Sequence, residues 1–182
     1  IEGGATIVQL RAPQWKKRHR YECALALKDV LHAYQVPLII DDDLDIALAC
    51  NADGVHVGQK DLPVHIVRKF LGPDKIVGLS INNEQQMLAV DPSVVDYVGV
   101  GPVFSTTTKP DAEAATGIDG LAKLMKLCPV PAVAIGGIKS HHIAEIAATG
   151  VQGVAVVSAI CGQNDPLASA RELSELWKRF SN

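Results

Sequence analysis

The residues best suited to chemistry form a run of three hydroxyl groups and one ammonium group, Thr106-Thr107-Thr108-Lys109. The run follows a short apolar stretch, residues 96–101, which has the pattern of a buried strand and is broken at Pro102. Threonine hydroxyls donate hydrogen bonds to phosphate oxygens, and a lysine adds a positive charge. We therefore predict an anion site for a phosphorylated substrate. The alternative is a polar loop with a solvated lysine.

Two further polar residues, Gln9 and Arg11, lie at the end of a first apolar stretch. Because side chains two positions apart in a strand share a face, the amide and the guanidinium would point to the same side and bind an anionic ligand there. The alternative is that Arg11 is a core arginine held by a salt bridge. The basic residues that follow are interpreted mostly as the solvated start of a helix: Lys16, Lys17, Arg18 and Arg20.

Four carboxylates crowd the end of the second apolar stretch: Asp41, Asp42, Asp43 and Asp45. Adjacent carboxylates repel one another unless a cation or hydrogen-bond donors offset them. Hard oxygen ligands of this kind suit Mg²⁺, and Asp61, after the third apolar stretch, would join Asp42 as a second metal carboxylate. The alternatives are that Asp43 and Asp61 only cap the helices that follow them.

Small residues follow the later apolar stretches. Gly136-Gly137 and Ser158 precede helices, whose N-terminal N–H groups favour an anion, so we predict a second phosphate contact there, next to Val157. The alternative for the glycine pair is a tight turn that needs positive φ. Ser80 follows the fourth stretch and carries no nucleophile motif.

Three histidines are assigned no chemistry. His56 is interpreted as a packed residue rather than a general base. His141 and His142 are interpreted as surface residues in the first turn of a helix. The predicted site therefore combines two anion sites with a Mg²⁺ site and offers no obvious nucleophile or general base. Such a set suits a reaction in which pyrophosphate leaves with metal assistance, because positioning and electrostatics then carry the catalysis.

The elements that must position these residues alternate along the chain. Short apolar, β-branched stretches predict strands at residues 6–10, 37–40, 54–58, 76–79, 97–100, 132–135 and 153–157. These stretches are continuous rather than alternating, as is typical of parallel strands buried on both faces. A helix is predicted after each strand, at residues 20–34, 44–50, 61–71, 83–89, 121–128, 140–150 and 165–180. Asn83, Ser140 and Asp165 are the predicted caps of three of these helices.

Strict strand–helix alternation predicts an α/β fold with a parallel sheet. Polar residues at the strand ends and glycine turns after the last two strands favour a TIM (βα)₈ barrel, forming a single domain over residues 1–182. A closed barrel needs eight strands, so we expect a first strand and helix to precede Ile1. An open, doubly wound sheet is the alternative.

The composition is that of an ordinary globular protein, with 48% hydrophobic and 20% charged residues among 182. A net charge of -3 gives no reason to expect nucleic acid as a partner, and no apolar run is long enough to cross a bilayer. The four cysteines are widely spaced, which predicts reduced, mostly buried thiols and a cytoplasmic protein. A homo-oligomer is compatible with this sequence.

An ordered set of motifs along the whole chain resembles the thiamine-phosphate synthase family: Val8-Gln9-Leu10-Arg11, Ile39-Ile40-x-Asp42, Ala52 to Asp61, Gly78-Leu79-Ser80, Asp96 to Lys109, Ala134 to Ile138 and Val156 to Ile160. The resemblance implies a (βα)₈ barrel that uses Mg²⁺ and acts on phosphorylated small molecules. Its members join a pyrimidine carried on pyrophosphate to a thiazole monophosphate, giving thiamine phosphate and pyrophosphate. Pyrophosphate departs first, and the thiazole nitrogen captures the pyrimidine-methylene cation that remains.

The resemblance also implies a role for each matching residue. The pyrimidine pyrophosphate would lie along Gln9 and Arg11, with Ser80 near the pyrimidine ring and Lys109 on the pyrophosphate, which makes Arg11, Ser80 and Lys109 the predicted catalytic residues. Asp42 and Asp61 would hold Mg²⁺. The thiazole phosphate would be received by Thr106, Thr108, Gly137, Val157 and Ser158. The predicted substrate-binding set also includes the adjoining residues Asp41, Thr107 and Gly136.

Two stretches depart from the family pattern. Ala12-Pro13 stands where the family usually has Glu-Lys, and Asp41 and Asp43 replace an asparagine and an arginine. We expect these changes to make the pyrophosphate corner more negative. Two alternatives follow: a thiazole tautomerase-like enzyme, which would lack the Thr-x-Thr-Lys run and Asp61, and a barrel that binds thiazole or thiamine phosphate without turnover.

Overall fold

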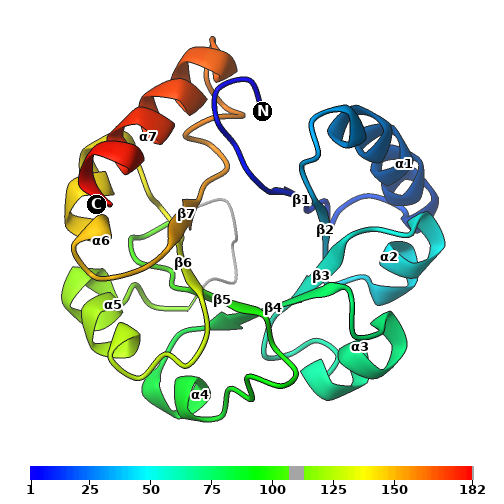
Figure 1. Cartoon of the computed structure of the whole chain (residues 1–182), viewed down its shortest axis with the longest axis horizontal. Coiled ribbons are helices and arrows are strands. Elements are labelled where there is room, and N and C mark those ends of the chain that lie inside the picture. The colour runs from blue at the N-terminus through cyan, green and yellow to red at the C-terminus, as the bar shows by residue number, and fades with distance from the viewer. Residues whose placement is uncertain (107–112, 182) are drawn as a thin grey trace. The chain divides into compact units, whose positions relative to one another are not determined.

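The computed structural model describes residues 1–106 and 113–181. Within these residues the chain has an α/β fold in which seven parallel strands alternate with seven α-helices (Figure 1). The chain divides into two compact units. The β1–β4 unit contains Thr6–Leu79 and Ser93–Asp96, and the β5–β7 unit contains Ile1–Ala5, Ser80–Pro92 and the chain from Tyr97 onward.

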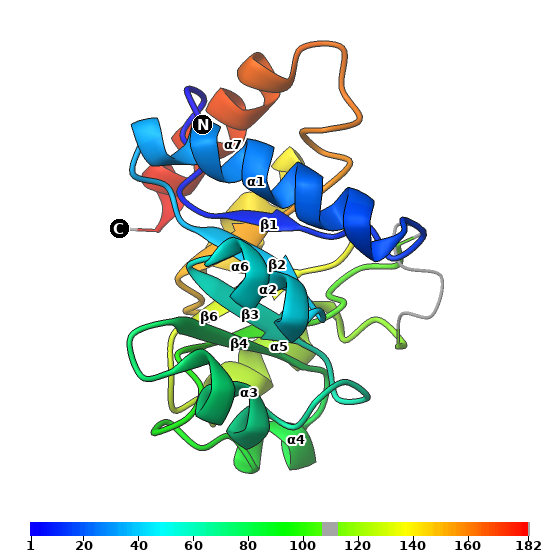
Figure 2. The same ribbon diagram turned by 90° about the vertical axis from the view of Figure 1, so that its right-hand side faces the viewer.

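The β1–β4 unit is a parallel sheet with helices on its outer side. Its elements are β1 (Val8–Leu10), α1 (Lys17–Ala33), β2 (Leu38–Asp41), α2 (Leu44–Cys50), β3 (Gly54–Val57), α3 (Val64–Leu71) and β4 (Ile76–Ile81), whose last two residues belong to the other unit. Ile39, Val55 and Val77 on three successive strands are fully buried. Helices α1, α2 and α3 follow one another along the sheet in chain order (Figure 2).

The β5–β7 unit repeats the same arrangement. Its elements are α4 (Glu84–Leu88), β5 (Tyr97–Val100), α5 (Gly117–Met125), β6 (Ala132–Ile135), a 3₁₀ turn η1 (Ser140–His142), α6 (Ile143–Ala147), β7 (Gly153–Ala155) and α7 (Pro166–Phe180). Parallel pairing sets Val98 opposite Ala132 and Ala134 opposite Val154. Asn83 caps α4 and Asp165 caps α7, as predicted, each accepting a hydrogen bond from a backbone N–H three residues on.

All seven predicted strands are confirmed, with ends that differ by at most two residues. β4 continues to Ile81, whose carbonyl accepts a hydrogen bond from the Gly101 N–H at 3.0 Å. β7 ends at Ala155 because the chain then forms a turn in which the Val157 carbonyl accepts from the Cys161 N–H at 2.8 Å.

Several predicted helix boundaries are wrong. The helix predicted at 140–150 with Ser140 as its cap is instead η1 followed by the short α6, and the cap position belongs to Lys139. The first helix begins at Lys17 rather than residue 20, the third begins at Val64, and α5 covers Gly117–Met125 rather than 121–128. Single capping residues carry too little free energy to decide a boundary against tertiary packing.

The four cysteines are free thiols, as predicted, but the expectation that they are mostly buried is wrong, because Cys161 is exposed and Cys23 and Cys128 are only half-buried. Burial raises the pKa of Cys50 and of Cys128. Among the described residues, no helix combines the length and the apolar character needed to span a membrane.

We predict that Gly54→Ala destabilises the β1–β4 unit by about 1–3 kcal/mol, because a Cβ at residue 54 would lie 2.7 Å from the Ile76 Cβ on the paired strand β4. The matched control is Gly153→Ala, at the first residue of β7, where the nearest atom would be a Val133 methyl at an ordinary 3.5 Å. Urea denaturation measures the free energy of unfolding of both variants. If both lose the same amount, the close contact with Ile76 is not the reason why glycine is needed at residue 54.

Candidate active site

The end of β1 carries the predicted anion ligands Gln9 and Arg11. Gln9 is exposed on the strand, and Arg11 directly follows it. The Arg11 Nε lies 3.2 Å from the Asp41 carboxylate, and the Arg11 side chain is 26% exposed. The alternative for Arg11, a core arginine held by a salt bridge, is therefore confirmed for the salt bridge, but Arg11 does not lie in the core.

The acidic residues begin where β2 ends. Asp41 is the last residue of β2 and lies opposite His56 of β3. Asp42 leaves the strand with a left-handed backbone, φ 61°, which aspartate tolerates better than most residues. Its N–H donates to the His56 carbonyl at 2.8 Å, and His56 is buried, as expected for a packed residue. The β2 end is therefore fixed to β3 at Asp42.

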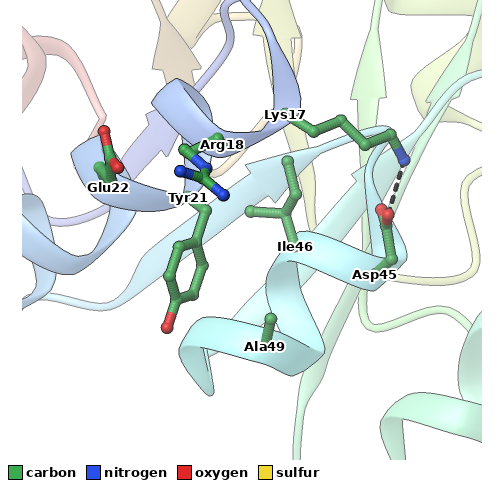
Figure 3. A pocket seen from close by; sticks show the side chains of 7 residues that line it. All are labelled: Lys17, Arg18, Tyr21, Glu22, Asp45, Ile46 and Ala49. Atoms are coloured by element: carbon green, nitrogen blue, oxygen red, sulfur yellow. Dashed lines mark hydrogen bonds and ion pairs between the residues drawn. The ribbon is translucent and has the colours of Figure 1, made fainter.

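Helix α1 supplies cations to the next two carboxylates. Asp43 pairs with Arg20 and also lies 3.4 Å from the Lys17 Nζ. Lys17 lies 2.6 Å from the Asp45 carboxylate (Figure 3). The hydrogen bond between these two groups raises the pKa of Lys17 and lowers the pKa of Asp45. The Arg20 and Asp43 side chains are only 18% and 14% exposed, whereas Lys17 and Asp45 are both 61% exposed.

These contacts correct two expectations. Asp43 occupies the N-cap position of α2, but its side chain makes no capping hydrogen bond and pairs with α1 instead. Arg20 is not part of a solvated helix start, because its side chain is mostly buried against Asp43. Lys17 and Arg20 are three residues apart and so share a helix face, which was the one signal that could have identified them.

A surface pocket lies beside this ion-pair network, between α1 and α2 (Figure 3). Its walls are formed by Lys17, Arg18, Tyr21, Glu22, Asp45, Ile46 and Ala49. Asp45 belongs to the acidic run considered above for Mg²⁺, and the pocket's other six lining residues were not predicted to belong to a site. It is therefore a groove between two helices rather than a binding site at the strand ends.

The predicted metal carboxylate Asp61 closes the turn after β3. Its Oδ2 accepts from the Gly58 N–H at 2.8 Å, and Pro63, not Asp61, occupies the N-cap position of α3, so the capping alternative is wrong. Within residues 1–106 and 113–181, no group of three or more His, Cys, Asp or Glu side chains could hold a metal ion. Mg²⁺ is usually held by one or two carboxylates together with substrate phosphates, so a cluster of three protein ligands is not required. Mg²⁺ binding by Asp42 and Asp61 therefore stays a prediction.

The β5–β7 unit contains the remaining described candidates. Ser80 is half-buried inside β4 rather than after it, because the strand is longer than predicted. Thr106 is half-buried in the loop after β5. Thr107, Thr108 and Lys109 lie outside the described residues.

The loop after β6 brings the glycine pair against the loop after β5. Gly136 and Gly137 have φ values of 89° and 65°, which confirms the turn with positive φ. A Cβ at residue 137 would lie 2.6 Å from the Ser105 carbonyl oxygen, so only glycine allows this approach. After β7, Val157 and Ser158 are both exposed in a turn, and the Ser158 carbonyl accepts from the Gln163 side chain at 2.8 Å.

His142 differs from its expected surface position, whereas His141 is exposed as predicted. The His142 ring is half-buried and stacks on Phe104, with ring centroids 3.7 Å apart and planes at 19°. Burial is the largest cause that lowers the pKa of His142, and the neighbouring His141 lowers it further. The spacing of these residues gave no signal, because the contact joins the loops after two different strands.

We predict that Arg20→Met lowers the free energy of unfolding by about 1–3 kcal/mol, because it leaves the mostly buried Asp43 carboxylate without its closest cation. Lys17→Met is the matched control and should cost less than about 0.5 kcal/mol, because its ion pair with Asp45 is solvent-exposed. Urea denaturation distinguishes the two, and an Arg20→Met loss no larger than that of Lys17→Met would contradict the prediction.

Comparison with known proteins places this geometry in a family. A sequence profile described as "Thiamine monophosphate synthase" matches residues 1–160. The chain is 51% identical to thiamine-phosphate synthase of Laribacter hongkongensis over 97% of its length and 83% of that protein, and 47% identical to the Vibrio campbellii enzyme over 98% and 87%. The structure of thiamine phosphate pyrophosphorylase from Pyrococcus furiosus matches with a TM-score of 0.91 and 35% identity, covering 100% of this chain and 87% of that one. The chain therefore belongs to the thiamine monophosphate synthase family.

Proposed function

We propose that this protein is a thiamine-phosphate synthase, a transferase that joins hydroxymethylpyrimidine pyrophosphate to thiazole phosphate and releases pyrophosphate. The observation that carries the proposal is family membership along nearly the whole chain, with relatives of that name about half identical to it. The seven parallel strands would then be seven units of a single (βα)₈ barrel domain, and the enzyme would act in the cytoplasm on phosphorylated small molecules.

Gln9 and Arg11 would bind the pyrophosphate of the pyrimidine substrate. A guanidinium carries five N–H donors, so pairing its Nε with Asp41 uses only part of its capacity. The carboxylate also restricts the conformations of the Arg11 side chain. Arg11 is thus suited to receive phosphate oxygens in a defined orientation.

The departures at Asp41 and Asp43 are offset by cations of the same unit. Arg11 pairs with Asp41, and Arg20 and Lys17 face Asp43. Arg11 belongs to the family motif, whereas Arg20 and Lys17, which the motif does not include, offset the charge of Asp43. This supports turnover over the alternative of a barrel that binds without reaction.

Asp42 and Asp61 would hold Mg²⁺. The donor chemistry fits, because both are carboxylates of the β1–β4 unit that follow paired strands, and the Asp42 N–H binds the β3 backbone from which the Asp61 turn departs. Bound Mg²⁺ would supply positive charge that stabilises the departing pyrophosphate. Neighbouring carboxylates Asp43 and Asp45 are instead paired with α1.

In the β5–β7 unit, the thiazole phosphate would be received by Thr106, Gly136, Gly137, Val157 and Ser158. Glycines at the β6 end expose backbone N–H groups, and Thr106 adds a hydroxyl donor. Ser80 beside the pyrimidine ring, and Thr107, Thr108 and Lys109 on phosphate oxygens, complete the proposal. Because pyrophosphate departs before the new bond forms, no residue needs to act as a nucleophile or strong base.

The proposed function predicts pyrophosphate release that requires both substrates and a divalent cation. The purified protein should release pyrophosphate with Mg²⁺, and EDTA should abolish the release. A coupled phosphate assay measures it, with each substrate omitted in turn as a control. Thiazole phosphate binding without pyrophosphate release would favour the non-catalytic alternative, and isomerisation of a thiazole precursor alone would favour the tautomerase.

We predict that Asp61→Asn lowers kcat by about 100-fold while thiazole phosphate affinity stays within about twofold. The amide oxygen can still accept the Gly58 N–H, so the turn is kept and the charge needed for Mg²⁺ is lost. Kinetics with titrated Mg²⁺ and calorimetric binding measure the two effects. Asp45→Asn is the matched control with unchanged kcat, and a parallel loss of activity and affinity in Asp61→Asn would limit Asp61 to a structural role.

A further inference from the structure

The loop that carries Thr106 is fixed by contacts with the loop after β6. The Phe104 N–H donates to the Gly136 carbonyl at 3.1 Å. The missing side chain of Gly137 lets the Ser105 carbonyl come close, as described above. Thr106 directly follows these contacts, so its position depends on how Phe104 and Ser105 are held.

One face of Phe104 is covered by the His142 ring. The centroid distance of 3.7 Å and the angle of 19° between planes make this a stacked pair, and both rings are half-buried. His142 is itself fixed by the backbone, because its Nδ1 accepts from the Lys139 N–H at 3.2 Å. The stack therefore links η1 to the loop that precedes Thr106.

This arrangement requires a neutral imidazole. An imidazolium carries N–H groups on both nitrogens, so its Nδ1 could no longer accept from the Lys139 N–H. Burial lowers the pKa of His142, and His141 and Lys139 lower it further, whereas Glu145 raises it. His141 meets the His142 ring edge-on at 4.0 Å. In the folded protein the neutral form is thus favoured.

We propose that His142 is a positioning residue for thiazole phosphate binding: its ring holds Phe104 and so places Thr106 beside the glycine turn. The inference rests on the proposed function and adds to it a side chain that touches no substrate atom. It also gives substrate affinity a dependence on pH. In the folded protein the pKa of His142 lies below its ordinary value of 6.5. The stack is therefore fully effective above pH 6.5 and is lost as the pH falls through the lowered pKa.

Two substitutions separate the ring from its hydrogen bond. His142→Asn keeps a side-chain acceptor near the Lys139 N–H and removes the stack, whereas His142→Phe keeps a stacking ring and removes the titrating group. We expect His142→Asn to raise the KM for thiazole phosphate about 10-fold, with kcat and the KM for the pyrimidine substrate within about twofold. His142→Phe should stay within about threefold of wild type near pH 8 and rise less steeply in KM toward pH 5.5.

The comparison with His142→Phe is needed because thiazole phosphate itself gains a proton near pH 6. That ionisation affects every variant equally, so the difference between the two pH profiles isolates His142. His65→Asn, at an exposed position on α3, is the control and should change neither KM. If His142→Asn does not fold, Phe104→Leu removes the same stack from the other side and should give the same rise in KM.

The outcomes distinguish this inference from the function on which it rests. A wild-type protein that neither binds thiazole phosphate nor releases pyrophosphate would overturn both. An active wild type with an unchanged KM in His142→Asn would overturn the role of His142 alone. An equal change in both KM values and kcat, together with a lower Tm, would assign His142 to folding instead.

Discussion

Parallel pairing of neighbouring strands is the constraint on which the candidate site depends. It directs the carboxyl ends of adjacent strands to one edge, where polar side chains can meet. In the β1–β4 unit, the register that sets Leu10 opposite Ile40 and Asp41 opposite His56 leaves Arg11, Asp41 and Asp42 just where the buried apolar residues end. Because these strands are only three to six residues long, little chain separates the core from the polar edge.

At that edge the local electrostatics are set by which carboxylates already have cations. Asp43 and Arg20 form a mostly buried pair, in which each charge would be costly without the other. The Lys17–Asp45 pair is solvent-exposed and contributes little to stability. Asp42 follows the strand with a left-handed backbone conformation. The acidic run is therefore not one site with one purpose but several carboxylates with different partners.

The sequence predicted the strands well and the contacts between elements poorly. Continuous apolar, β-branched runs located the seven strands. The turn with positive φ, which was the alternative for Gly136-Gly137, is also present. The Arg20–Asp43 pair and the Phe104–His142 stack depend on how a helix or turn packs against a distant loop. The spacing of Lys17 and Arg20 indicates that they share a helix face but does not identify their partners, and no local spacing indicates the stack. Asp61 does not cap α3, because its carboxylate accepts a hydrogen bond from the Gly58 N–H instead.

The proposed reaction needs no nucleophilic side chain, so its catalysis would depend on anion binding and on a rigid site. An arginine that is free to move would lose conformational entropy when it binds pyrophosphate, and that loss reduces affinity. Asp41 already pairs with Arg11. If pyrophosphate binds at Arg11 as proposed, this pair restricts the arginine before binding but places one added negative charge near the anion. Because Asp41 is paired with Arg11, it repels a nearby anion less than an unpaired carboxylate would. A substitution that looks unfavourable by charge count alone is thus compatible with pyrophosphate binding.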